Sequence, residues 1–176
     1  TRLLLASNDV DSIRVADIAD GAGCSTATIH NHFPNALPDI LAAISEDIIQ
    51  TAFKQFEKVS KDFSGIELVR SYFKTVGEHI CEQADVAVPS IAISVDLASQ
   101  GSWFDRKIFS DCEELFKKAK ETEQINGSHN ELARLTHTFF QGALYSWALG
   151  SIDSEEFLRM STQSVDFAVS SCRGAA

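Results

Sequence analysis

Residues 22–34 read AGCSTATIHNHFP, which is the pattern of a tight turn followed by a short helix. Gly23 stands where such a turn needs a positive φ angle, and Ser25 is a good N-cap for the helix that follows. Ile29 and Phe33 are spaced to point inward from that helix. The stretch therefore predicts a helix that presents its remaining side chains outward.

A second short helix is predicted just before this turn, over residues 13–21, IRVADIADG. Val15, Ile18 and Ala19 fall on one face of it. Two short helices joined by three or four residues that include glycine have the spacing of a helix-turn-helix. A plain αα-corner with a glycine turn has the same spacing, so spacing alone leaves both interpretations open.

Apolar residues recur at intervals of three and four through the rest of the 176-residue chain. This periodicity predicts amphipathic helices over residues 39–58, 66–84, 103–122, 129–149 and 154–172. Residues 91–97, IAISVDL, alternate like a strand, but a lone strand would have no partner, so we interpret 89–100 as a buried helix. The predicted fold class is all-α.

Helix boundaries are marked by capping residues and glycines. The S-x-x-E spacing of a capping box occurs at Ser64 and at Ser128, and Asp153 with Glu156 can act similarly. Glycines expected at helix ends are Gly101, Gly127 and Gly150.

Residues 17–33, DIADGAGCSTATIHNHF, resemble the DNA-binding signature of the tetracycline-repressor (TetR) family. That signature has I-A-x-x-A-G-V-S, then a small residue, an aliphatic-aromatic pair and H-F, and the likeness covers roughly the first fifty residues. The resemblance implies a homodimeric regulator, most simply a repressor, that releases a double-stranded DNA operator when a small-molecule effector binds. It implies a helix-turn-helix domain over 1–38, whose N-terminal part we expect to lie before Thr1, and an effector-binding and dimerisation domain over 39–176.

Three positions depart from the family pattern. His30 replaces the usual tyrosine, Ala27 a glycine, and Ala36 a lysine that contacts phosphate in the family. Up to residue 53, two arginines face seven acidic residues, a formal charge of −5 within a chain of −10 and pI near 4.8. This balance argues against a protein that coats nucleic acid by bulk charge.

The candidate DNA-binding residues lie on and beside the second helix. Asparagine and threonine side chains are suited to contacts with bases and phosphates. The alternative is that these residues form an ordinary solvent-exposed helix face, and that His32 has a packing or hydrogen-bonding role. The predicted set is Arg14, Ser25, Thr26, Ala27, Thr28, His30, Asn31 and His32.

A pocket for an apolar or cationic effector is expected inside the larger domain. Phenylalanines offer apolar walls there, and a polar stripe recurs at every fourth position of one helix. The predicted lining residues are Phe73, Trp103, Phe104, His137, Gln141 and Tyr145. For each polar residue the alternative is a satisfied core or interface group.

Self-association is predicted through the last two helices, 129–149 and 154–172. Small residues there permit close helix approach beside large apolar anchors. The predicted interface set is Phe140, Ala143, Trp147, Ser161, Ser164, Phe167 and Ala168. The alternative is that these stripes close the core of one chain.

Other functions have little support in the sequence. There is no G-x-S-x-G, H-E-x-x-H or P-loop motif, so we expect no enzyme activity and no catalytic residues. Four widely separated cysteines predict neither a metal site nor closely spaced disulfides, and no cofactor is expected. No apolar run approaches the roughly 20 residues that span a bilayer, so we expect a cytoplasmic protein without membrane contact. The alternative function is a dimeric helical module that binds a small molecule or protein and retains the motif with weak or no DNA binding.

Overall fold

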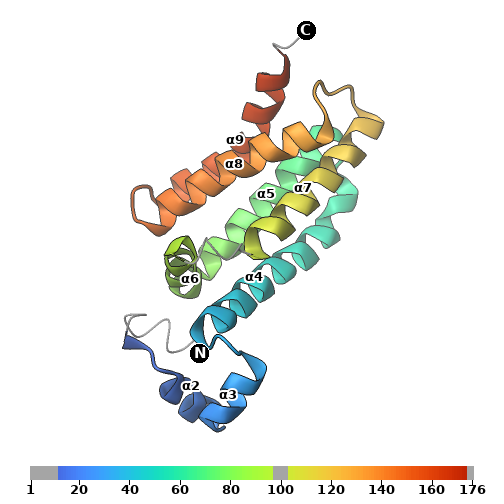
Figure 1. Ribbon diagram of the computed structural model, residues 1–176. Coiled ribbons are helices and arrows are strands. Elements are labelled where there is room, and N and C mark those ends of the chain that lie inside the picture. The colour runs from blue at the N-terminus through green and yellow to red at the C-terminus, as the bar shows by residue number, and fades with distance from the viewer. Residues whose placement is uncertain (1–11, 97–102, 174–176) are drawn as a thin grey trace.

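The computed structural model describes the backbone of residues 12–96 and 103–173 and the side chains of 12–91 and 107–172. Every regular element in these ranges is helical, which confirms the all-α class. In chain order the elements are α2 (Val15–Ala22), α3 (Thr26–His32), α4 (Leu37–Val59), the 3-10 turn η2 (Ser60–Asp62), α5 (Gly65–Glu82), α6 (Ala84–Asp96), α7 (Trp103–Thr122), α8 (His129–Ala148) and α9 (Ser154–Arg173). Figure 1 shows α2 and α3 at one end of the molecule, with the longer helices stacked beyond them.

The two short helices end where the sequence predicts. The carboxylate of Asp17 accepts a hydrogen bond from the Arg14 backbone N–H at 3.0 Å at the start of α2. Gly23 ends this helix in the left-handed region at φ 66°. The Ser25 hydroxyl caps α3 by accepting from the Thr28 N–H at 3.1 Å. These contacts fix the turn without help from distant parts of the chain.

Helix α4 connects the two parts of the molecule. Pro38 lies in its first turn, where a missing backbone N–H costs nothing. In its first half, Ile40 and Ile44 line a groove together with residues of α2 and α3, and the helix also contacts α5, α6 and α7. The expected division at residue 38 therefore falls in the first turn of a helix that serves both parts.

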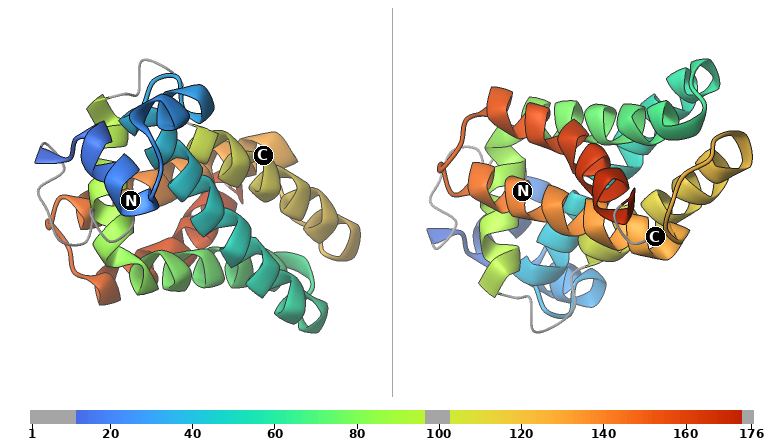
Figure 2. Two further views of the ribbon diagram at one scale, coloured as in Figure 1. Left: turned by 90° about the horizontal axis from the view of Figure 1, so that it is seen from below. Right: turned by 90° about the horizontal axis from the view of Figure 1, so that it is seen from above.

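The core of the larger part surrounds α5, which packs against α4, α7 and α9. Phe140 from α8 lies 5.1 Å from Phe73 of α5 and 5.8 Å from Phe157 of α9, measured between ring centroids. Gly77 allows α5 and α9 to approach closely, since a Cβ there would lie 3.2 Å from the Leu158 side chain. Figure 2 shows α9 alongside both α5 and α8 when seen from above.

Side-chain caps are predicted at the starts of three helices, and two of the three are formed. Ser128 caps α8 by accepting from the Glu131 N–H, and Asp153 accepts from the Glu156 N–H, as predicted. The Ser64 side chain makes no capping hydrogen bond. Instead, the first N–H groups of α5 donate to the end of α7: Gly65 to the Thr122 hydroxyl at 3.1 Å and Ile66 to the Glu123 carboxylate at 2.8 Å. A distant segment therefore replaces the predicted local cap.

The alternating segment is helical, as interpreted, because α6 continues to Asp96 despite Pro89 within it. Residues 97–100 of the expected helix and Gly101 lie outside the described residues. Gly150 directly follows the C-cap of α8 with a φ angle of 73°, as predicted. Gly127 also has a positive φ angle, 85°, but the prediction that it ends a helix is wrong, because α7 already ends at Thr122 and Gly127 lies just before the Ser128 cap of α8.

Candidate nucleic-acid interface and effector region

The helix-turn-helix lobe, residues 12–36, is built around a very small core. Ile18 and Ala19 of α2 are 2% exposed and Ile29 of α3 is 7% exposed. Ile18 and Ile29 line a shared groove with Ile40 and Ile44 of α4, which extends the small core of two helices of eight and seven residues. The angle of α3 is therefore set by α2 and α4 together.

All eight predicted DNA-binding residues are exposed. Successive helical residues are about 100° apart, so Ala27 and Asn31 lie opposite the buried Ile29, at the centre of the outer face of α3. Thr28 and His30 flank them on the two sides. The structure thus brings these residues together on one surface.

One pair of candidate side chains is already engaged. The hydroxyls of Ser25 and Thr28 lie 2.9 Å apart and form a hydrogen bond, while Ser25 also accepts from the Thr28 N–H. Thr26 and Asn31, by contrast, make no side-chain hydrogen bond to the described part of the protein. Their polar groups are free to contact an external partner.

The turn between α3 and α4 holds a feature that the sequence did not predict. Ala36, at the position of the lysine in the family pattern, has a φ angle of 56°, unusual for a residue other than glycine. Its N–H donates to the Phe33 carbonyl and its carbonyl accepts from the Ile40 N–H. No periodicity or motif signals this conformation, because it results from closing the turn onto α4.

The charge around the lobe is acidic. Helix α2 exposes Asp17 and Asp20, and α3 contains no lysine or arginine. Asp39 at the start of α4 accepts hydrogen bonds from the backbone and side chain of Asn35. Apart from the two histidines, Arg14 is the only basic residue in the sequence of residues 12–36.

A groove of about 380 Å³ lies between the lobe and the first half of α4. Its lining residues are Ile18, Ala22, Ile29, Phe33, Ile40, Ala43, Ile44 and Asp47, so it is apolar apart from one carboxylate. The groove could not be found from sequence, because its walls come from three helices whose angles are set by packing.

The predicted effector residues have separate positions in the fold. Phe73 is fully buried and stacks edge-on with Tyr72 and Phe140, so it fills the core where we expected it to line a pocket. Phe73 belongs to a series of apolar residues three and four positions apart, and that spacing is equally typical of a helix face buried in the core. The side chains of Trp103 and Phe104 lie outside the described residues.

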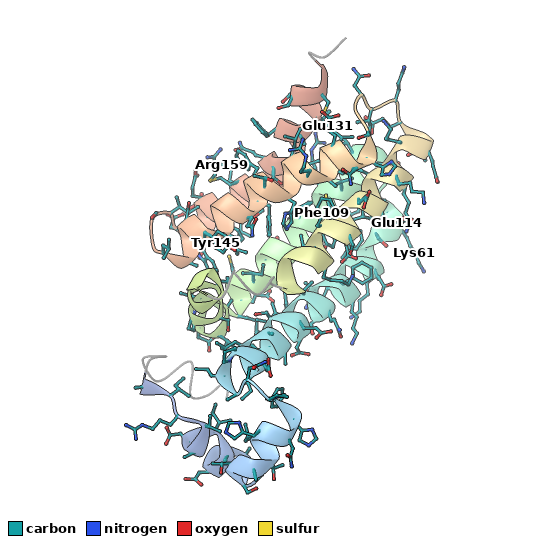
Figure 3. The ribbon with its side chains drawn as sticks, viewed as in Figure 1. Lys61, Phe109, Glu114, Glu131, Tyr145 and Arg159 are labelled. Carbon is teal, nitrogen blue, oxygen red and sulfur yellow. The ribbon has the colours of Figure 1, made fainter. Side chains whose placement is uncertain are left out.

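The polar stripe on α8 is half-buried. Gln141 donates from Nε2 to the Tyr145 hydroxyl at 3.0 Å, and the His137 ring packs edge-on against Phe109 of α7 at 5.8 Å. Figure 3 shows Phe109 and Tyr145 on the side of α8 that faces α6 and α7. The structure therefore places these three polar residues on one face, and the cavity itself stays a prediction.

A charged network that the sequence analysis missed joins α4, α5 and α7. The Tyr72 hydroxyl donates to the Asp111 carboxylate at 3.1 Å, and Lys107 pairs with the same carboxylate. The Lys107 ammonium also lies 4.7 Å from the centroid of the Phe53 ring. Burial first, and then the Asp111 charge, raises the pKa of Tyr72 well above its ordinary value, which keeps its hydroxyl protonated as a donor. Only the i, i+4 spacing of Lys107 and Asp111 hinted at this network.

The predicted dimer residues need correction. Six of the seven are buried inside one chain: Phe140, Ala143, Trp147, Ser161, Ser164 and Ala168 are at most 7% exposed. They pack α8 and α9 against each other and against α5, because small residues serve close packing within a chain as well as between chains. Phe167 alone of the set is exposed, at 47%.

The outer face of α8 and α9 carries other apolar and small residues. Leu149 directly after α8 is 70% exposed, and Gly142 faces open space. Phe167 of α9 packs on Phe139 of α8, with 5.2 Å between ring centroids. Relative exposure, which sequence periodicity does not give, distinguishes this surface from the buried stripe.

Two other kinds of site are absent from the residues that the structure describes. Among the described residues, no group of three histidine, cysteine or acidic side chains is arranged to hold a metal ion. No helix in the described part of the chain is both long and apolar enough to cross a membrane.

The fold resembles that of a previously solved structure. A crystal structure of a protein from Rhodococcus sp., assigned to the TetR family of transcriptional regulators, matches with a TM-score of 0.70 and 17% sequence identity. The match covers 96% of this chain and 93% of that one. No protein-family model and no curated protein matches the sequence. At this identity the likeness establishes the shared fold.

Proposed function

We propose that this chain is a transcriptional regulator that binds a pseudo-palindromic DNA operator as a homodimer. The observation that carries the proposal is α3, a capped helix held by one buried residue, with all its other side chains exposed. Likeness of fold to a TetR-family regulator supports it. In a dimer, two such helices enter successive major grooves about 34–36 Å apart.

Selection of bound sequences from a pool of random DNA duplexes tests this function. The expected result is enrichment of one pseudo-palindromic sequence, and Asn31→Ala should then weaken binding to it by about tenfold or more, because a side chain that reads a base edge is lost. Asn130→Ala, an exposed asparagine at the start of α8, is the matched control. If no sequence is enriched at any salt concentration, the proposal is wrong.

The dimer that we propose uses the exposed face of α8 and α9, centred on Phe167 and Leu149. Two helices from each protomer then form a four-helix bundle with two-fold symmetry. Phe167→Glu should convert the dimer into a monomer in light scattering, since it places a charge in an apolar seam. Phe63→Glu, at an equally exposed phenylalanine of the α4–α5 turn (41%), should not. A monomeric native protein would contradict the dimer.

The effector site that we propose lies beside the polar stripe of α8 and takes a small apolar or cationic molecule. A ligand between α8, α7 and α6 is positioned to shift α4, which contacts both α6 and α7 and continues to the lobe. Such a ligand changes DNA affinity only if it prefers one arrangement of these helices. Gln141→Leu and Tyr145→Phe should reduce effector-induced DNA release while leaving DNA binding itself intact.

A second candidate function is a dimeric, cytoplasmic helical module that binds a small molecule or protein and binds DNA weakly or not at all. The acidic lobe favours it, because non-specific DNA affinity depends on the phosphates that lysine and arginine neutralise. The duplex selection separates the two functions. Retained effector binding without any enriched sequence would favour this second function.

A further inference from the structure

On α3, the helix that is proposed to enter the DNA groove, the only side chains that can carry a positive charge are histidines, which are charged only when protonated. Helix α3 has two histidines, His30 and His32, and no lysine or arginine. Both histidines are exposed, and neither forms a hydrogen bond or ion pair with the described residues. Histidine is the side chain whose charge ordinarily changes between pH 5 and 8.

The positions of the two histidines on the helix suit contacts with phosphate. Taking Ile29 as the inward direction, His30 lies about 100° to one side and His32 about 60° to the other. A helix in the major groove has a phosphate strand along each flank, while its outermost face meets the base edges. His30 and His32 therefore lie on opposite sides of α3, and both are in its last turn, where the helix dipole favours a cation.

The charged and titratable groups around the two histidines lie on α2, on the turn that follows it and on α4. Helix α2 carries Asp17 and Asp20, with Arg14 at its start, and the first half of α4 carries Asp39, Glu46 and Asp47. The turn between α2 and α3 carries the half-buried thiol of Cys24. Protonation of both histidines changes the formal charge of residues 12–36 from −1 to +1.

From this geometry we infer that His30 and His32 are protonation-dependent phosphate contacts, so that DNA affinity rises as the pH falls from about 8 to about 5.5. The inference rests on the proposed DNA-binding function and adds a regulation to the same site. Phosphate stabilises the imidazolium, so DNA binding takes up protons, and by reciprocity protons strengthen DNA binding. Because residues 12–36 contain no lysine, the two protonated histidines supply a large share of the positive charge in the lobe.

The test uses the full chain and a fluorescein-labelled duplex of mixed sequence, about 30 base pairs long, because phosphate contacts dominate non-specific binding. Fluorescence anisotropy should give at least about a tenfold rise in affinity between pH 8 and pH 5.5. Four added contacts per dimer should steepen the slope of log K against log salt by about 3 to 4. Circular dichroism at each pH verifies that the fold is unchanged.

Three variants separate a local effect from a general one. With His30→Gln and His32→Gln together, the affinity ratio between the two pH values should fall close to one. With His30→Lys and His32→Lys, affinity should be high and nearly independent of pH, because the charge is permanent. His129→Gln, at an exposed histidine at the start of α8, should keep the full pH dependence.

Two results would overturn the inference. The first is DNA binding whose pH dependence survives the double glutamine variant, which would leave the proposed function intact. The second is a pH dependence reduced as strongly by His129→Gln, which would point to overall charge. An absence of binding to mixed-sequence DNA at either pH and to every selected sequence would refute both the inference and the proposed function.

Discussion

The helix-turn-helix lobe and the bundle of α5 to α9 are both helical, but different contacts hold them. In α2 and α3 the buried residues are Ile18, Ala19 and Ile29, and the helix ends are set by side chains within three residues. The bundle buries a continuous chain of aromatic rings and a charged network between helices far apart in sequence. Local signals therefore set the helix ends and the turn of the lobe, although α4 extends its core, whereas the bundle depends throughout on contacts between distant segments.

Phe140→Ala, in the core of the bundle, should cause the largest loss of stability. Removing a ring that contacts Phe73 and Phe157 leaves a cavity and should lower the free energy of unfolding by about 3–5 kcal/mol in urea titrations. Phe167→Ala, on the exposed face of α9, should cost less than about 1 kcal/mol at protein concentrations where the chain is monomeric. Equal losses would mean that the buried ring does not anchor the bundle.

Asp111→Ala should have the next largest effect. It leaves the buried Tyr72 hydroxyl without its acceptor and Lys107 without its ion pair, which should cost about 2–3 kcal/mol. Glu114→Ala breaks the exposed pair with Lys117 on the same helix and should cost less than about 1 kcal/mol. Thermal unfolding of both variants measures the difference, and a reversed order would contradict a structural role for the network.

Glu123→Ala tests whether a distant residue caps α5. Losing the acceptor for the Ile66 N–H should lower the free energy of unfolding by about 1–2 kcal/mol. Ser64→Ala, which removes the side chain that the capping-box pattern favours, should change it by less than about 0.5 kcal/mol. A larger cost at Ser64 in denaturant titrations would restore the local cap that the sequence suggested.

Ser25→Ala should give the smallest global change, because it acts within the lobe. The loss of the α3 cap should cost about 1 kcal/mol of local stability. Hydrogen exchange should accelerate at the amides of α3 while those of α5 and α8 keep their protection. Equal acceleration in the bundle would show that the two regions unfold as one unit.

The interpretations that succeeded depend on neighbours in the chain. The turn at Gly23, the cap at Ser25 and the outward positions of α3 follow from φ preferences, capping chemistry and helical periodicity, all of which operate within about one turn. Even the alternating segment 91–97 was correctly interpreted as helical as far as Asp96, because a single strand has nothing to pair with.

The predictions that were wrong concern what each apolar helix face packs against. Phe73 and Phe140 have the same helical spacing as pocket or interface residues, and only the packing of α5, α8 and α9 places both in the core. Periodicity identifies an apolar face but does not say whether it meets the same chain, a second chain or a ligand.

The sequence by itself determined the helical class, the two short helices joined at Gly23 and the absence of lysine and arginine from α3, since each depends on residues close together in the chain. Only the tertiary structure decided that the end of α7 caps α5, that Asp111 and Lys107 link α7 to α5 and α4, and that Phe167 and Leu149 remain exposed. These depend on angles and distances between helices, which arise from the simultaneous packing of side chains far apart in the chain.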